Sequence, residues 1–319
     1  MGKTKKKKSG KKSFLSSRTS WFDKKTMDNP VKAGVVSASL GIPEEIVGPD
    51  YAVDAKPKLQ RTKETVLTAE QIVRMEESCT LARKILDATV AIAAEGVTTD
   101  DLDRFAHKMT IEAGAYPAPY NYHGFPKSIC TSVNEVICHG IPDSRPLADG
   151  DAVNIDVTVY YKGMYGDCSS TVLIGNVTEE NKKLVEVTYE SMMAGISVVK
   201  PGAKVSDIGC AIEDLVSDAG YSIVTSYGGH GIGEVFHTQL HIAHYYDSKN
   251  NMVFKPGMTF TVEPMVNMGN AGHRLWNDGW TAATADSTRS AQFEHTVLVT
   301  EKGVKILTLP EGVEQPFEH

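Results

Sequence analysis

The sequence lacks several features that would have fixed its class at once. No apolar run approaches the roughly 20 residues of a membrane-spanning helix, and no apolar stretch follows the basic N-terminus as in a secretory signal. The five cysteines are dispersed without a Cys-x-x-Cys pair, which argues against a disulfide framework and a cysteine-based zinc site. A His-Glu-x-x-His pattern is also absent. We therefore expect an intracellular, cytoplasmic protein with no membrane segment.

Charge is distributed unevenly along the 319 residues. Residues 1–25 carry ten Lys or Arg against one Asp, although the whole chain has a net charge of −7, so the rest is acidic. Residues 1–30 have little apolar content and strong self-repulsion, which predicts a disordered Lys-rich tail. Such a tail either only aids solubility or binds a polyanion such as ribosomal RNA. A nuclear localisation signal is a third alternative.

Two further boundaries follow from composition and periodicity. Residues 31–67 contain Pro43, Pro49 and Pro57 and little periodicity, which predicts an extended linker laid over the body. Helical spacing of apolar residues begins at Thr68, which forms a capping-box pattern with Gln71. We expect one folded domain over residues 68–319.

An internal repeat divides this domain into two similar halves. Gly96 and Gly114 flank an amphipathic segment, and Gly202 and Gly220 flank another at the same spacing. The similarity continues into DGDAVNID and PGMTFTVE, where an acid recurs six residues after a glycine. Two α+β halves facing each other would bring those acids, Asp156 and Glu263, together near a pseudo-two-fold axis.

Acidic residues interrupt four apolar strand patterns. The stretch NIDVTVYYKGMYGD predicts a hairpin turned by Lys162-Gly163, with Asp156 in its first strand and Asp167 near the end of its second. The second half supplies Glu263 and Glu294 in similar surroundings. One such acid is usually an edge residue or an ion-pair partner. Four of them buried near one axis require about four positive charges.

Lys and Arg are scarce beside these strands, so the balancing charge must come from elsewhere. Two divalent cations would balance four carboxylates, and His230, among the glycines of GGHGIG, offers an imidazole. Alone, His230 would more often be an ordinary turn histidine. Carboxylates with one imidazole suit Mn, Fe, Co or Zn. Two such ions lower the pKa of a bridging water and generate a hydroxide nucleophile.

Several stretches, in order and spacing, carry a resemblance over about residues 68–310. They are KSICTSVNEVICHGIPD, NIDVTVYYKGMYGDCS, GGHGIGEVFH, GMTFTVEPM and SAQFEHTVLVT. The chain resembles the type 1 methionine aminopeptidases, in an N-terminally extended form without a zinc-finger domain. The resemblance implies the pita-bread fold, an antiparallel sheet covered by helices in pseudo-two-fold halves, with residues 68–319 as the catalytic domain. The close spacing of Glu263 and Glu294 leaves no room for the helical insertion of type 2.

The resemblance also implies roles for individual residues. The implied metal ligands are Asp156, Asp167, His230, Glu263 and Glu294. His139 and His237 match histidines that face the substrate, and Glu263 matches the group that shuttles a proton. The methionine side-chain pocket is implied for Tyr122, Phe125, Cys130, Phe236 and Trp276, whose rings and thiol also suit a thioether on chemical grounds.

These features together predict removal of the initiator methionine from nascent chains whose second residue is small, with two divalent ions of unknown identity. We expect a monomer whose partners are nascent N-termini and, through the Lys-rich tail, the ribosome. A prolidase or X-Pro aminopeptidase of the same fold is the alternative enzyme. A catalytically silent relative that binds nucleic acid or protein through the tail is the alternative from another class.

Overall fold

A computed structural model describes residues 30–58 and 66–317. Nearly all of the predicted tail, and residues 59–65 of the predicted linker, lie outside the described residues. The four described α-helices are α1 (Ala69–Ile92), α2 (Thr99–Glu112), α3 (Glu179–Ser197) and α4 (Val205–Asp218). None of the described helices is long and apolar enough to cross a bilayer.

A long hairpin forms the middle of the central sheet. Strands β4 (Ala152–Tyr161) and β5 (Met164–Leu173) pair antiparallel along their whole length. Lys162 and Gly163 form the two-residue turn with φ angles of 50° and 80°, the left-handed conformation that such a turn requires. The predicted hairpin and its turn are confirmed.

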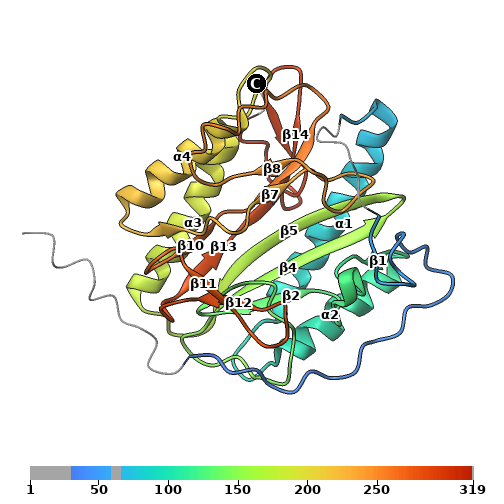
Figure 1. The fold of residues 1–319 in the computed structure, drawn as a ribbon. Helices are drawn as coiled ribbons and strands as arrows, with labels where there is room; N and C mark the ends of the chain where they lie inside the picture. Colours follow the sequence, from blue (N-terminus) through green and yellow to red (C-terminus); the bar gives the residue numbers. More distant parts are fainter. Residues whose placement is uncertain (1–29, 59–65, 318–319) are drawn as a thin grey trace, which may run out of the picture.

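The remaining strands of this sheet continue on both sides of the hairpin (Figure 1). The order is β1-β4-β5-β14-β15, with β2 also paired to β4 and β9 to β14. Their bounds are β1 (Tyr116–Pro117), β2 (Cys130–Val133), β9 (Thr259–Val262), β14 (Glu294–Val299) and β15 (Val304–Ile306). Since β5 pairs with β14, one continuous sheet joins the two halves of the chain.

Three small sheets and a 3-10 turn, η1 (Tyr122–Gly124), complete the body. The first contains β13 (Ser290–Gln292), β10 (Met265–Asn267) and β6 (Ser222–Ile223). The second contains β11 (His273–Leu275), β12 (Ala282–Thr284) and β3 (Val136–Cys138). The third pairs β7 (Gly229–His230) with β8 (His241–Ile242).

The two halves repeat the same local structure. Helices α2 and α4 have 14 residues each, and each follows an isolated bridge, Thr98 with Pro146 in one half and Lys204 with Val253 in the other. Each half also has its own buried cluster, one around α1, α2 and β4, the other around α3, α4 and β9. The predicted α+β fold with pseudo-two-fold halves is therefore confirmed.

The beginning of α1 follows the predicted pattern. Thr68 accepts a hydrogen bond from the Gln71 backbone, and the Gln71 side chain accepts one from the Thr68 backbone in return. Helix α1 then packs across β4 and β5, with Met75, Cys79 and Ile85 fully buried. The helix thereby backs the two strands that carry Asp156 and Asp167.

Residues 31–58 run over the surface of the first half without helix or strand (Figure 1). Gly34 and Val35 bond to Asp143 and Ser144. The Tyr51 hydroxyl, buried in the body, donates to the Ala118 carbonyl at 2.6 Å. These contacts fix the described linker against the body of the fold.

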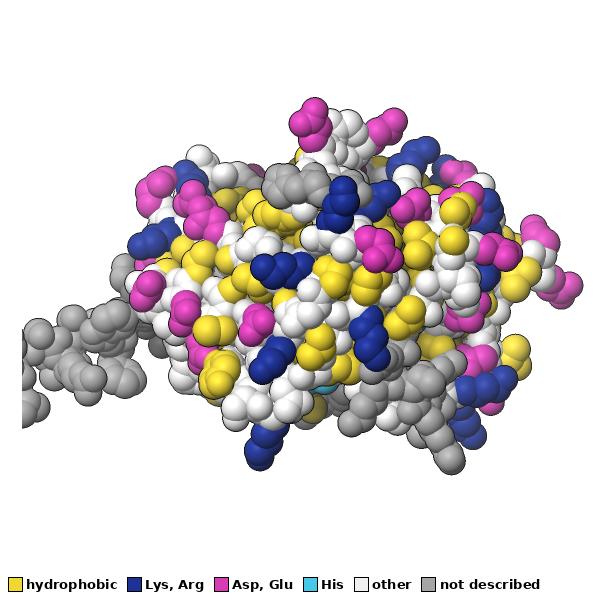
Figure 2. Space-filling model, turned by 90° about the horizontal axis from the view of Figure 1, so that it is seen from above, with side chains coloured by type: hydrophobic (Ala, Val, Ile, Leu, Met, Phe, Trp, Pro, Cys, Tyr) yellow, Lys and Arg dark blue, Asp and Glu magenta, His cyan; other side chains and the backbone are white. Residues whose placement is uncertain are grey.

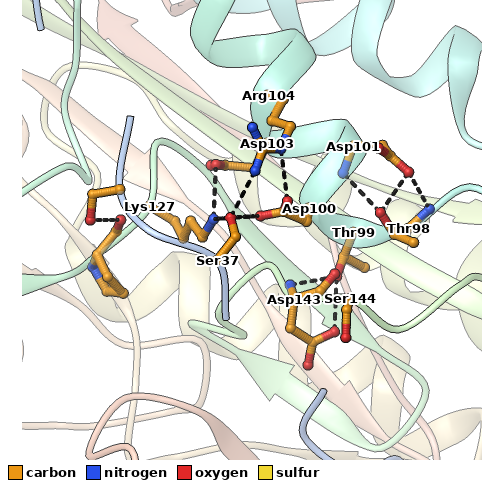
Figure 3. A network of polar contacts seen from close by, with 12 residues as sticks. Ser37, Thr98, Thr99, Asp100, Asp101, Asp103, Arg104, Lys127, Asp143 and Ser144 are labelled. Carbon is orange, nitrogen blue, oxygen red and sulfur yellow. Dashed lines mark hydrogen bonds and ion pairs between the residues drawn. The ribbon is translucent and has the colours of Figure 1, made fainter. Parts of the chain in front are cut away.

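Ser37 joins the linker to a buried group of charges, which we name the linker cluster: Ser37, Asp100, Asp103, Arg104 and Lys127 (Figure 3). Lys127, 1% exposed, pairs with Asp100 and lies 3.8 Å from Asp103. Arg104 donates to Asp100 at 2.8 Å. Each acid of the linker cluster therefore has a cation of the chain beside it.

The outer surface has a different electrostatic character. On the face in Figure 2, Lys and Arg side chains lie between Asp and Glu side chains, with hydrophobic groups among them. The acidic excess of the body is thus spread among opposite charges on this face.

Candidate metal centre and substrate cavity

Strand register brings the four predicted acids onto one region of the central sheet. Asp156 on β4 and Glu294 on β14 both lie opposite Ser169 of β5, on its two sides. Asp167 is two residues before Ser169 and therefore points to the same face. Glu263 follows the last residue of β9, beside the start of β14.

His230 is placed against these carboxylates by the β7–β8 pair. Its Nε2 atom lies 3.7 Å from Asp167 Oδ2 and 3.6 Å from Glu263 Oε1. Donor atoms of Asp167, His230 and Glu294 all lie within 4.8 Å of one another. A Cβ at Gly229 would lie 2.2 Å from the Thr261 carbonyl oxygen, so this close approach of β7 to β9 requires glycine.

Burial changes the acidity of all four carboxyl groups. Burial, opposed by hydrogen bonds from Thr158 and the Cys168 backbone, raises the pKa of Asp167 to about 7. Burial and neighbouring acids raise the pKa values of Asp156, Glu263 and Glu294 well above their usual range. Burial likewise lowers the pKa of His230 to about 4. The cluster therefore lacks a permanent positive charge of its own.

The residues present fit divalent cations. Among residues 30–58 and 66–317, His230 is the one basic side chain within 4 Å of these carboxylates. Asp156 Oδ1 is buried without a hydrogen-bond partner. Four carboxylates and one neutral imidazole form the oxygen-rich, borderline donor set that Mn, Fe, Co and Zn accept. A bound cation would explain both the unpaired Asp156 oxygen and the negative charge of the four carboxylates, which no cation among the described residues balances.

Several side chains that the sequence did not single out orient the carboxylates. The Thr158 hydroxyl donates to Asp167 at 2.7 Å. Glu263 accepts hydrogen bonds from Thr261 at 2.8 Å and from the Gln292 amide at 3.1 Å. The Glu263 backbone N–H donates to His244 Nε2 at 3.1 Å. Strand alternation could have identified Thr158, which faces the same side as Asp156, but not the long-range partner Gln292.

A cavity of about 390 Å³ opens onto this cluster. All five predicted ligands line its wall: Asp156, Asp167, His230, Glu263 and Glu294. Six of the predicted substrate-facing residues also line it: Tyr122, Phe125, Cys130, His139, Phe236 and His237. The structure thus brings together eleven residues that are widely separated in the sequence.

Aromatic contacts shape the apolar side of the cavity. The Tyr122 ring lies 4.9 Å from Phe236 and 5.2 Å from His237. Cys130, which pairs with Asp156 across β2 and β4, is buried, and burial raises its thiol pKa well above the usual value. The thiol is therefore held neutral, as a soft apolar surface beside the acids.

The two histidines predicted to face the substrate come from different segments of the wall. His139 follows β3 and His237 lies in the loop between β7 and β8. Desolvation lowers the pKa of His139 to about 4, and desolvation together with His230, His139 and His123 lowers that of His237 well below its usual value, although His237 is exposed at the cavity. Both rings are therefore neutral near pH 7, with one N–H available to donate.

The expectation for Trp276 needs correction. Trp280, not Trp276, lines the cavity, with its ring 5.2 Å from Phe125 and 6.2 Å from His139. The two tryptophans are separated by a turn, in which the Trp276 N–H donates a hydrogen bond to the Thr281 carbonyl. Trp276 instead lines a small separate cavity beside Val31. Three residues of turn lie between these tryptophans, and the sequence alone did not indicate which ring faces the acids.

The fold and the site define a metal-dependent peptidase. The model of metallopeptidase family M24 matches residues 73–301. Methionine aminopeptidase 1A of Arabidopsis thaliana is 51% identical over 284 residues, which cover 88% of this chain and 71% of that protein. Methionine aminopeptidase 2 of Mycobacterium tuberculosis is 47% identical over 276 residues, 86% of this chain and 96% of that protein.

A solved structure gives the same result for the fold. The methionine aminopeptidase of Rickettsia prowazekii superposes with a TM-score of 0.76 at 47% identity, covering 77% of this chain and 100% of that one. The chain belongs to metallopeptidase family M24, in its type 1 methionine aminopeptidase branch.

Proposed function

We infer that this protein is a methionyl aminopeptidase, which removes the N-terminal methionine of proteins whose second residue is small. The observation that supports this most strongly is the cavity in which an aromatic, thiol-bearing wall adjoins four unbalanced carboxylates. Similarity to methionine aminopeptidases over most of the chain supports the same function. The substrates are then the N-termini of nascent chains.

The metal site is proposed to consist of Asp156, Asp167, His230, Glu263 and Glu294. Two divalent ions, of Co, Mn, Fe or Zn, supply Lewis-acid polarisation of the scissile carbonyl and activation of a water when bound. Thr158, Thr261 and Gln292 hold Asp167 and Glu263 in place through the hydrogen bonds given above. Held carboxylates bind metal in one geometry, without the entropic cost of ordering each ligand.

The remaining polar residues act on the peptide. Glu263, whose carboxyl group has a raised pKa, is proposed to accept the proton of the attacking water at its carboxylate and pass it to the leaving amine. His139 and His237 donate N–H groups to the scissile carbonyl and the departing amide. Tyr122, Phe125, Cys130, Phe236 and Trp280 enclose the methionine side chain.

A series of Met-X peptides tests this function. A second residue larger than Gly, Ala or Ser would crowd the acids and histidines, so Met-Lys and Met-Leu should turn over orders of magnitude more slowly than Met-Gly and Met-Ala. A hydrophobic pocket discriminates one methylene by about 1–3 kcal/mol, so norleucine should replace methionine with a modest loss. The measurement is kcat/KM for each peptide.

The alternative within the same fold is a prolidase or X-Pro aminopeptidase. Faster release of Pro, Leu or Ala than of Met, or a flat profile across X, would favour that alternative. A catalytically silent binding protein would turn over none of these peptides. The complete set of five donors around one cavity favours the enzyme, because loss of one carboxylate suffices to disable such a site.

The Lys-rich tail is proposed to associate with ribosomes in the cytoplasm, with the enzyme acting as a monomer. Ten basic residues within residues 1–25 would bind ribosomal RNA in a salt-dependent manner. A variant that lacks residues 1–30 should keep its turnover of Met-Ala-Ser and lose cosedimentation with ribosomes at low salt. Unchanged cosedimentation of the variant would contradict the association. Sedimentation of the free protein as a dimer would contradict the monomer.

A further inference from the structure

A second cavity, of about 420 Å³, adjoins the one above. The two share four lining residues: Tyr122, Phe236, His237 and Thr238. We name it the outer cavity. Its size is typical of ligand sites, and no role described so far uses it.

Residues of the linker build one wall of the outer cavity. Pro49, Asp50, Tyr51, Pro57 and Lys58 all line it. This wall is fixed, because Tyr51 is 1% exposed and the Asn121 amide donates to the Ala52 carbonyl at 3.0 Å. The Lys58 N–H also bonds to the Asp50 carboxylate at 2.8 Å.

Aromatic rings form another part of the lining. Tyr160 and Tyr165, on β4 and β5, have ring centroids 4.9 Å apart. Tyr165 stacks on Phe236 at 5.1 Å, and Tyr51 meets Tyr122 edge to face at 5.0 Å. These rings offer a large contact area that suits varied apolar side chains, beside the charged side chains of Asp50, Lys58 and Glu234 that also line the cavity. At the rim, the carboxylate of Glu234 already pairs with Arg74 at 3.3 Å.

We propose that the outer cavity binds the third and fourth residues of the substrate chain, with a preference for an aromatic or large apolar side chain there. This inference rests on the proposed function. A peptide whose methionine lies against Tyr122 and Phe236, and whose second residue lies beside His237, must continue out of the first cavity. The outer cavity shares His237 and Thr238 with the first cavity, so the third and fourth residues of the peptide enter it. Residues of the segment 49–58 line this cavity and therefore help to bind the substrate.

Peptide length in matched variants tests the proposal. The wild-type protein should cleave Met-Ala-Phe-Phe with kcat/KM about tenfold or more above that for Met-Ala, mainly through KM, since an aromatic side chain leaves water. Met-Ala-Gly-Gly should gain much less. Tyr160→Ser should remove most of the gain for Met-Ala-Phe-Phe while retaining Met-Ala turnover. Tyr161→Ser, the neighbour that faces the other side of β4, is the control and should keep the gain.

A second variant guards against misfolding of Tyr160→Ser. Gln239, exposed on the rim of the outer cavity, can be replaced by Arg to narrow the entrance. The Gln239→Arg variant should also reduce the gain for Met-Ala-Phe-Phe while leaving Met-Ala unchanged. Equal kcat/KM for the dipeptide and both tetrapeptides in wild type, or a gain that survives both variants, would overturn the inference. Failure to release Met from any peptide would instead overturn the proposed function.

Discussion

Two buried clusters of acids in this molecule differ in how their charge is balanced. In the linker cluster, Lys127 and Arg104 lie beside Asp100 and Asp103 (Figure 3). In the metal centre, four carboxylates meet one histidine. Both clusters are built from acids on, or directly after, regular elements packed against a buried core. They differ in whether the chain itself supplies the cations.

The pKa values of the carboxyl groups reflect this difference. Burial alone would raise the pKa of Asp100, but hydrogen bonds from Lys127, Ser37 and Arg104 outweigh it and lower the pKa to about 2. Asp103, more deeply buried, has its pKa raised by burial to about 6 in spite of two backbone N–H donors and Lys127. In the metal centre, by contrast, all four pKa values are raised. A cluster with its own cations needs no ion from outside, whereas an unbalanced one indicates a bound cation.

The largest effect is expected where a proposed ligand is removed. His230→Ala should lower metal affinity by at least about 100-fold, and activity with it, because a direct ligand contributes at least as much as the groups that orient it. His237→Ala, the matched control from the loop that follows β7, should retain metal and lose about 10²–10³ in kcat, the usual worth of a transition-state donor. Metal titration followed by kinetics measures both. Equal metal loss in the two variants would refute the division of roles.

A smaller effect, on stability, is expected in the balanced cluster. Lys127→Met should lower the free energy of unfolding by about 3–5 kcal/mol, because Asp100 and Asp103 would stay buried without their shared cation. Lys108→Met is the control: its ion pair with Glu112 is largely exposed, so the change should stay within about 0.5 kcal/mol. Urea denaturation of metal-loaded protein measures both. Similar values for the two variants would mean that the linker cluster contributes no more than a surface pair.

The smallest effect is expected from pH. The pKa of Asp167 is raised in the metal-free fold to about 7, above its usual value of 3.8, so its contribution to stability is full below about pH 4 and is lost as pH rises through 7. The melting temperature of chelator-treated protein should therefore fall between pH 5 and pH 8, and added Mn²⁺ should reduce that fall. A melting temperature that rises over this range without metal would contradict the unbalanced charge.

The grouping of the four acids could be predicted from the sequence because its signals are local. An acid inside an apolar strand is visible in the sequence, and the repeat of Gly150 and Asp156 in Gly257 and Glu263 indicated that the two acids meet. The turn at Lys162-Gly163 and the capping box at Thr68 are likewise local, and the structure contains both. Short-range patterns of this kind determine strand faces and helix ends.

Other features depend on contacts between distant segments, which one sequence does not reveal. Lys127 and Ser37 are 90 residues apart, and no pattern at either position indicates their hydrogen bond. Gln292 and His244 form hydrogen bonds with Glu263. These three residues come from segments that only the folding of the chain brings together. The choice between Trp276 and Trp280 depended on the direction of one turn.

Metal stoichiometry tests the central claim most directly. Chelator-treated protein is titrated with Mn²⁺ or Co²⁺ by calorimetry, alongside Asp156→Asn and an Asp100→Asn variant of the linker cluster. The account predicts two ions per wild-type chain, activity that follows their binding, fewer ions for Asp156→Asn, and two for Asp100→Asn. Full activity of metal-free wild type, or two ions bound equally well by Asp156→Asn, would contradict it.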